Sequence, residues 1–141
     1  MSADSADHGG WVETDSVTLD GDLVATLVSR GGYTHPLFDV ATHGESTPLP
    51  GQGVLLLAGG LVEQCGVLDD AVAMLELKSV RFNQMVRAGD DLRVRVTPGE
   101  WRETSSGKFV QQFAWVVLTR VDDVVAQSDV VMLMHQYVRG N

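Results

Sequence analysis

A histidine beside a proline is the first group in this sequence that could carry out chemistry. His35 precedes Pro36, and the carboxylate of Asp39 follows four residues later. Imidazole has a reference pKa of about 6.5, so His35 could act as an acid or a base near neutral pH, with Asp39 orienting the ring. Tyr33 could donate a hydrogen bond but is a poor base, since its reference pKa is about 10. The alternative interpretation is a histidine hydrogen-bonded to the backbone of a tight turn.

Two further candidate groups lie near the end of an apolar segment. Glu63 is the one carboxylate in residues 53–66 and could activate water, although it also fits a helix end that emerges into solvent. Cys65 is the only cysteine and fits a small buried hydrophobe better than a nucleophile. One cysteine permits neither an internal disulfide nor a cysteine-based metal site. We expect neither a metal nor another cofactor.

The elements that position these groups begin with two helices separated by a long irregular segment. Residues 20–29 carry apolar side chains at helical spacing, and Asp20 is a suitable N-cap. Residues 31–52 are rich in glycine and proline and predict a functional loop. Residues 53–66 are apolar almost all round, which predicts a buried helix. The glycine pair 59–60 costs about 1 kcal/mol per residue relative to alanine and indicates close approach of another backbone.

Four strands are predicted after the second helix, over residues 71–82, 92–97, 108–121 and 124–137. Their connections are short, so consecutive strands are antiparallel. The last two strands are apolar on both faces, which indicates a helix over one face and another subunit over the other. The pattern predicts an α+β hotdog fold, an antiparallel sheet wrapped around one long central helix. We expect a single domain over residues 11–141 and a disordered tail over residues 1–10.

Composition and charge exclude several classes of function. The chain has 141 residues, a formal net charge of −9 and a pI of about 4.6, so it would repel nucleic acid phosphates. The acidic residues 1–10 do not resemble a signal peptide. The longest apolar stretch, 54–62, is too short to cross a membrane. We expect no nucleic acid or membrane partner and a cytoplasmic location, which a single cysteine also fits.

Four stretches of the chain resemble the MaoC-like dehydratases, which include the R-specific enoyl-CoA hydratases. Gly32–Phe38 resembles the family's hydratase motif Gly-Asp-x-Asn-Pro-(Leu/Ile)-His, and Gln52–Leu55 resembles the His-Gly-Met-Leu start of its central helix. Val17–Val24 is similar to the segment that leads into the family's first helix. Ser79–Leu92 is similar to its signature Arg-Phe…Pro-Val-x-Pro-Gly-Asp-x-Leu between two strands. Together these stretches cover roughly residues 17–134.

The resemblance implies an activity and an assembly. The family forms homodimers whose sheets join edge to edge, and it binds an acyl-CoA or acyl-carrier-protein thioester between helix and loop. It catalyses the reversible loss of water from a 3-hydroxyacyl thioester, and the Asp and His of the motif act on that water. An amide at the start of the central helix binds the thioester carbonyl. By resemblance we expect a homodimer or a dimer of dimers, with Phe38, Gln52, Gly53, Val54 and Arg81 as substrate-binding residues.

The sequence departs from the family at the positions that carry its chemistry. Tyr33 replaces the Asp of the motif, Phe38 replaces the His, and His35 replaces the Asn. Neither Tyr33 nor Phe38 can take a proton near pH 7, so the dyad is absent and we expect little hydration of crotonyl-CoA. Any turnover that remains should depend on His35. Glu63 lies at neither position where hotdog thioesterases and carrier-protein dehydratases carry a carboxylate.

Three functions therefore stay open. The first is an acyl-thioester dehydratase or hydratase, of the hydro-lyase class, with altered acid–base groups. The second is a hotdog acyl-CoA thioesterase in which His35 or Glu63 activates water. The third is a non-catalytic acyl-thioester-binding subunit whose partner supplies an intact dyad.

Overall fold

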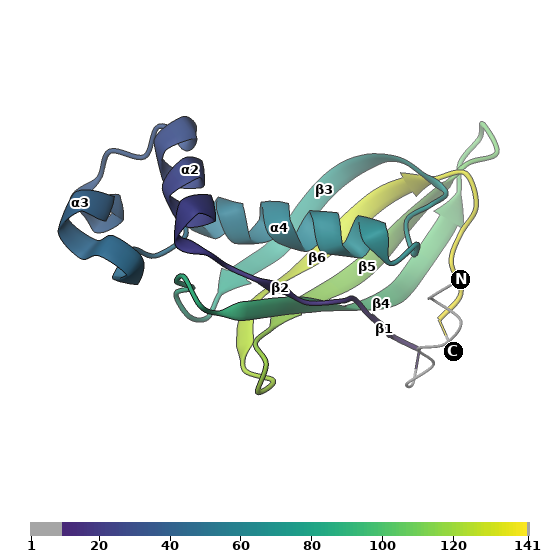
Figure 1. The fold of residues 1–141 in the computed structure, drawn as a ribbon. Helices are drawn as coiled ribbons and strands as arrows, with labels where there is room; N and C mark the ends of the chain where they lie inside the picture. Colours follow the sequence, from purple (N-terminus) through teal and green to yellow (C-terminus); the bar gives the residue numbers. More distant parts are fainter. Residues whose placement is uncertain (1–9, 141) are drawn as a thin grey trace.

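The computed structural model describes residues 10–140, so the predicted disordered tail lies almost wholly outside the described residues. One antiparallel sheet has the order β1-β4-β5-β6-β3, and β2 also pairs with β4 (Figure 1). The strands are β1 (Val12–Glu13), β2 (Val17–Thr18), β3 (Ala71–Phe82), β4 (Asp91–Glu103), β5 (Phe109–Leu118) and β6 (Val124–Met134). The four predicted strands are found, although β4 runs on to Glu103, well beyond the predicted end at residue 97. Strands β5 and β6 end earlier than expected, because turns follow Leu118 and Met134.

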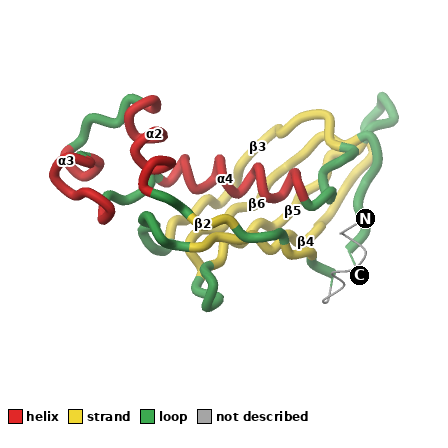
Figure 2. The backbone as a smooth tube through the Cα atoms, in the orientation of Figure 1, coloured by secondary structure: helices red, strands yellow, loops and turns green. Residues whose placement is uncertain are grey.

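Helix α4 (Gly51–Gln64) is the predicted central helix and runs across the concave face of the sheet (Figure 2). Val54, Ala58 and Val62 lie on its buried side, packed into the same core as the inner side chains of β4 and β5. The prediction of a helix buried all round is wrong, since Leu56 is 64% exposed and Glu63 is also exposed. One side of this helix therefore faces solvent in the single chain.

The glycine pair in the middle of α4 makes no close backbone contact within the described residues 10–140. A Cβ at Gly59 would meet only the ring of Trp115, at an ordinary 3.9 Å, and a Cβ at Gly60 would meet nothing within 4 Å. The predicted approach of another backbone is therefore not found among residues 10–140. Gly60 lies on the open side of the helix, next to Leu56 and Glu63.

Helix α2 (Gly21–Gly31) precedes α4 and lies beside its first turn (Figure 1), with Val24 and Val28 in the core. Asp20 caps it as predicted, because its Oδ1 accepts a hydrogen bond from the amide of Leu23 at 2.7 Å. Gly32 ends the helix with a φ of 77°, a left-handed conformation that glycine adopts without a steric penalty.

The segment between α2 and α4 is more regular than the sequence predicted. It contains two 3₁₀ helices, η1 (Pro36–Phe38) and η2 (Gly44–Ser46), and the short helix α3 (Val40–His43). The side chains of His35 and Asp39 cap η1 and α3, which makes these short turns possible despite the glycines and prolines. The candidate acid and base are therefore also the local capping groups of this segment.

The core lies between α4 and the inner face of the sheet. Inner side chains alternate along each strand, and the most deeply buried include Val94 and Val96 of β4 and Phe113 of β5. Trp115 is 2% exposed and belongs to this core, whereas Trp101 is 44% exposed and stacks on Tyr137 at 3.9 Å between ring centroids. Among residues 10–140, no helix is long and apolar enough to span a membrane.

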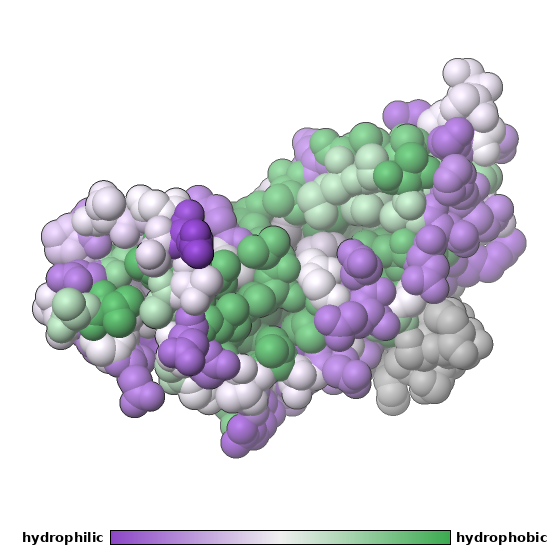
Figure 3. Space-filling view, turned by 45° about the horizontal axis from the view of Figure 1, so that its top comes forward, coloured by the Kyte–Doolittle hydropathy of each residue, from purple (hydrophilic) through white to green (hydrophobic). Residues whose placement is uncertain are grey.

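Strand β3 forms an open edge of the sheet and carries exposed apolar side chains along most of its length. Val72, Met74, Leu75, Leu77 and Phe82 are each between 41% and 52% exposed. Figure 3 shows hydrophobic side chains gathered in a broad surface on this side of the molecule. A surface of this kind on a single chain marks an interaction site or a ligand groove.

Candidate functional site

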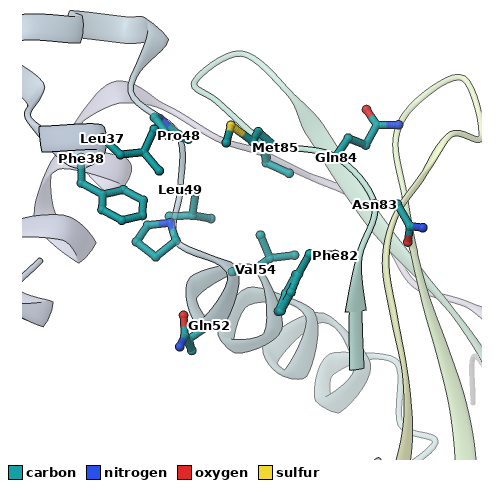
Figure 4. A pocket seen from close by; sticks show the side chains of 13 residues that line it. Leu37, Phe38, Pro48, Leu49, Gln52, Val54, Phe82, Asn83, Gln84 and Met85 are labelled. Atoms are coloured by element: carbon teal, nitrogen blue, oxygen red, sulfur yellow. The ribbon is translucent and has the colours of Figure 1, made fainter. Parts of the chain in front are cut away.

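A largely apolar pocket of about 430 Å³ lies where α4 begins, between the segment that precedes the helix and the connection that follows β3 (Figure 4). Its walls combine aromatic, aliphatic and proline side chains with three amides: Leu37, Phe38, Pro48, Leu49, Pro50, Gly51, Gln52, Val54, Phe82, Asn83, Gln84, Met85 and Val86. This pocket contains three of the predicted substrate-binding residues, Phe38, Gln52 and Val54. Gly53 is a neighbour of this wall, since its missing side chain leaves room for Leu49.

The start of α4 presents backbone donors at this pocket. Pro50 is the N-cap residue and has no side chain that could accept a hydrogen bond. The amides of Gly53 and Val54 donate to Pro50, whereas those of Gly51 and Gln52 donate to no group in the described part of the chain. Free amides and the positive end of the helix dipole favour an electron-rich ligand atom, such as a carbonyl oxygen.

Gly51 also allows an aromatic ring to lie against the helix start. A Cβ at this position would come within 2.8 Å of Cζ of Phe82, which is half exposed and forms one wall of the pocket. A ligand in the pocket could therefore reach the backbone of the first turn of α4 while it lies against the ring of Phe82. Gly51 is therefore required for its lack of a side chain, and this requirement could not be seen from the sequence motif.

Tyr33 and Phe38 are brought together next to the helix start. Their rings meet edge to face, with centroids 5.2 Å apart, and the Tyr33 hydroxyl donates to Oε1 of Gln52 at 3.3 Å. This hydrogen bond links the stretch 32–38, which resembles the family's hydratase motif, to the start of α4. A phenol, a benzyl ring and an amide supply hydrogen bonding and apolar contact but no group that transfers protons near neutral pH.

His35 lies on the other side of Phe38. Its Nδ1 accepts a hydrogen bond from the amide of Leu37 at 3.0 Å, so the neutral ring carries its proton on Nε2. His35 lines a neighbouring hollow of about 570 Å³ beneath α2, together with Tyr33, Phe38 and Asp39. Of these four residues, only Phe38 also lines the 430 Å³ pocket at the start of α4. His35 therefore makes the hydrogen bond to the backbone of a tight turn that was the alternative to a catalytic role. The side chain is exposed, and its Nε2 can still donate a hydrogen bond.

Asp39 does not orient the imidazole of His35. Its Oδ2 accepts from the hydroxyl of Thr42 at 2.6 Å and its Oδ1 accepts from the amide of Ala41 at 3.2 Å, so it caps α3. The hydrogen bond from Thr42 and then that from Ala41 lower the pKa of this carboxyl, and the charge of His43 adds to the effect. The expected orienting contact is wrong because the carboxylate is turned toward the following helix. His43 in turn donates from Nε2 to the carbonyl of Pro36 at 3.1 Å.

Glu63 lies along a third cavity, a groove of about 810 Å³ between α4 and β3. Most of its lining is apolar, including Leu55, Met74, Leu77 and Met132. The Glu63 carboxylate is exposed on the open side of α4, as the solvent-facing interpretation predicted, and no hydrogen bond to it is found among residues 10–140. Nothing in the described chain holds this carboxylate in place to activate water.

Cys65 and Arg81 are also placed by the structure. Burial raises the pKa of the Cys65 thiol, whose Sγ donates to the carbonyl of Val62 at 3.1 Å, and this favours the unreactive, buried role that the sequence predicted. Arg81 pairs with Gln127 across the sheet, while Phe82 pairs with the buried Ala126 and faces the pocket. Because neighbouring residues of a strand point to opposite faces, Arg81 projects away from the pocket.

Comparisons with known proteins identify the fold. No family model matches the sequence, and no curated protein matches it. The MaoC-like dehydratase from Rhodospirillum rubrum has a TM-score of 0.76 at 14% identity, covering 98% of this chain and 99% of that one. The (R)-hydratase from A. caviae involved in PHA biosynthesis has a TM-score of 0.70 at 20% identity, covering 89% and 95%.

A third solved structure supplies the name of the architecture. A conserved protein from Mycobacterium tuberculosis with a double hotdog fold has a TM-score of 0.73 at 18% identity, and the match covers 95% of this chain and 44% of that protein. The predicted fold class is confirmed: the chain has a hotdog fold, with an antiparallel sheet around a central helix. Its structural neighbours include MaoC-like dehydratases and an (R)-hydratase, as the sequence motifs had indicated.

Proposed function

We propose that this chain is a MaoC-like hotdog protein that binds an acyl thioester, carried on CoA or on a carrier protein, without an acid–base dyad of its own. The resemblance of the sequence motifs to the MaoC-like family supports the class of ligand, and the structural neighbours, a MaoC-like dehydratase and an (R)-hydratase, support the fold. Among the three functions left open by the sequence, the geometry of the pocket favours the binding subunit. The other two require a proton-transferring group beside the ligand.

The observation that carries this proposal is the pocket at the start of α4. The free amides of Gly51 and Gln52 can hold a thioester carbonyl, and the apolar wall of Phe38, Phe82 and Val54 can hold the first carbons of an acyl group. Tyr33 supports this arrangement through its hydrogen bond to Gln52.

Proton transfer in this pocket lacks a suitable residue. Phe38 is part of the pocket wall and has no proton to exchange. His35, the candidate base, lies across Phe38 from the pocket, and its Nδ1 lone pair is engaged by the amide of Leu37. These positions support binding with little hydration or dehydration by this chain alone.

The same proposal includes a second copy of the chain, joined along β3. The open edge of this strand has unpaired backbone groups, and its exposed apolar side chains continue onto the exposed side of α4. Glu76 and Lys78 point to the same face, because they pair with Val131 and Asp129 of β6 on either side of the inward-facing Leu77. Two antiparallel copies of β3 that pair about Leu77 would set Glu76 opposite Lys78 of the other copy.

The first test is calorimetric titration of the protein with acyl-CoA and acyl-pantetheine thioesters, beside an assay of crotonyl-CoA hydration. We expect saturable binding and turnover far below about 10 per second, the scale of an ordinary enzyme. Turnover at that scale would contradict the proposal. Hydrolysis of the thioester, measured by release of the free thiol, that survives His35→Ala but is lost in Glu63→Ala would assign the thioesterase alternative. Loss of hydration or of hydrolysis in His35→Ala would assign catalysis to the imidazole.

A further inference from the structure

The side chain of Arg87 is held at the rim of the pocket described above. Its Nε donates to the carbonyl of Ser46 at 2.9 Å, and its Nη2 lies 3.6 Å from Sδ of Met85, which lines the pocket. The amide of Leu49 donates to the carbonyl of Val86 at 2.7 Å, so the two wall segments are joined next to this arginine. The guanidinium is thus positioned between both walls, although it is exposed to solvent.

The charge of Arg87 has no carboxylate partner within ion-pair distance among residues 10–140. In contrast, Arg93, Arg95 and Arg120 all form ion pairs with acidic side chains. The nearby carboxylate of Asp90 accepts a hydrogen bond from the backbone amide of Arg87 at 2.9 Å, so it stabilises the turn and does not pair with the guanidinium. A guanidinium has five N–H donors, and most of those of Arg87 remain available.

Other cations among residues 10–140, such as Arg81 and Arg102, also form no ion pair, but Arg87 lies at the rim of the pocket. Together with the free amides of Gly51 and Gln52, it makes the surroundings of the pocket favourable for an anionic ligand. Arg81 cannot supply this charge, since it projects from the opposite face of the sheet. Arg87 also stands at the variable position of the Pro-Val-x-Pro-Gly-Asp signature, so the family resemblance does not assign it a role.

We propose that Arg87 binds the phosphate of the phosphopantetheine arm that carries the acyl group. This inference rests on the proposed function, because it takes the thioester to lie at the start of α4. The acyl group would then occupy the apolar pocket, and the arm would leave it past the rim, where solvent access is open. The planar guanidinium matches the geometry of phosphate oxygens, and this chemistry is shared by CoA and by a carrier protein.

The test compares ligands with and without the phosphate. We expect Arg87→Gln to weaken binding of an acyl-CoA by about fivefold or more, with partial recovery in Arg87→Lys, and to leave binding of the matching acyl-pantetheine unchanged. Arg102→Gln, an exposed arginine near the far end of β4, is the charge-matched control and should change neither affinity. The effect of Arg87→Gln should shrink as salt is added.

The outcomes separate the possible failures. An equal loss for acyl-CoA and acyl-pantetheine would overturn the inference, because it would show that Arg87 only supports the wall through Ser46. A loss for acyl-CoA but not for the acyl-carrier protein would also overturn it, because the contact would then belong to the nucleotide end of CoA. Failure of the unaltered protein to bind either thioester would overturn the proposed function itself and this inference with it.

Discussion

At the scale of single residues, two aromatic side chains account for the expected loss of acid–base chemistry. Tyr33 and Phe38 pack edge to face, and the Tyr33 hydroxyl donates a hydrogen bond to the side chain of Gln52 at the start of α4. In the family that the sequence resembles, these positions hold the carboxylate and the imidazole that act on water. The apolar walls and hydrogen-bond donors of the pocket support the proposed binding of a thioester without proton transfer by this chain.

Restoring the dyad should therefore bring hydration activity. We predict that Tyr33→Asp combined with Phe38→His raises the rate of crotonyl-CoA hydration by about 100-fold over the unaltered protein, since general acid–base catalysis contributes at least that much. The rate is measured by loss of the enoyl thioester absorbance. Tyr33→Phe with Phe38→Leu is the matched control, because it alters the same packing without adding titratable groups. A folded double variant with no gain would mean that substrate does not reach these positions.

At the scale of secondary-structure elements, the short strand β1 is tied to β4 by side chains as well as by its backbone. Glu13 accepts hydrogen bonds from Nε of Arg93 at 2.9 Å and from Nη2 of Arg95 at 3.1 Å. Burial opposes ionisation of Glu13, but the hydrogen bonds and charges of the two arginines outweigh it and lower its pKa. The guanidinium of Arg95 lies over the ring of Trp11, with 4.1 Å between Cζ of Arg95 and the ring centroid. This cluster holds the N-terminal segment against the sheet.

The lowered pKa of Glu13 predicts an acid-dependent part of the stability. A carboxyl whose pKa is lower in the folded state stabilises the protein above its unfolded pKa, and this contribution is lost as the pH falls through the folded pKa. We predict that Glu13→Gln lowers the free energy of unfolding at pH 7 by about 1 kcal/mol and reduces the loss of stability below about pH 4.5. Thermal unfolding at a series of pH values measures both effects.

Glu103→Gln provides the control for this measurement, because Glu103 is an exposed acid of β4 and no ion pair with it is found in the described chain. It should unfold like the unaltered protein at every pH. If Glu13→Gln showed the same free energy of unfolding and the same pH dependence as this control, the cluster around Arg93 would contribute nothing measurable.

At the scale of the whole molecule, the helix covers only part of the sheet. A groove of about 810 Å³ remains between α4 and β3, and Leu56, Met74 and Leu77 are exposed along it. Gly60 opens onto the same groove, with no atom near its missing side chain. In the proposed pairing, a second copy that joins along β3 would cover this surface and could approach Gly60, which has no close neighbour among residues 10–140.

The proposed pairing of β3 makes a prediction about charge. We expect the unaltered protein to sediment as a dimer or a larger even assembly at micromolar concentration. Glu76→Lys should shift it toward monomer, because it would set lysines against the two Lys78 side chains of the pair. The double variant Glu76→Lys with Lys78→Glu should restore the dimer, since the opposite charges are only exchanged. Sedimentation of the unaltered protein as a monomer, or no rescue by the double variant, would contradict this pairing.

The sequence by itself determined the elements and their class. The alternation of apolar residues in β4, the apolar run before Glu63 and the Asp20 cap are local patterns, and each produced the element predicted from it. Short connections between strands fixed their antiparallel order, and the motif comparison located the loop and the helix start that form the pocket. The replacement of Asp and His by Tyr33 and Phe38 was likewise visible without coordinates.

Only the tertiary structure decided which of the candidate residues share a site. His35 and Phe38 are three positions apart in the chain and both line the hollow beneath α2, but only Phe38 also reaches the pocket at the start of α4. Asp39 caps α3 because its nearest donors are the following backbone amide and Thr42. Arg87 reaches Ser46, 41 residues earlier, through a contact that no local pattern encodes. Side-chain direction and long-range contacts depend on packing, which spacing along the chain does not specify.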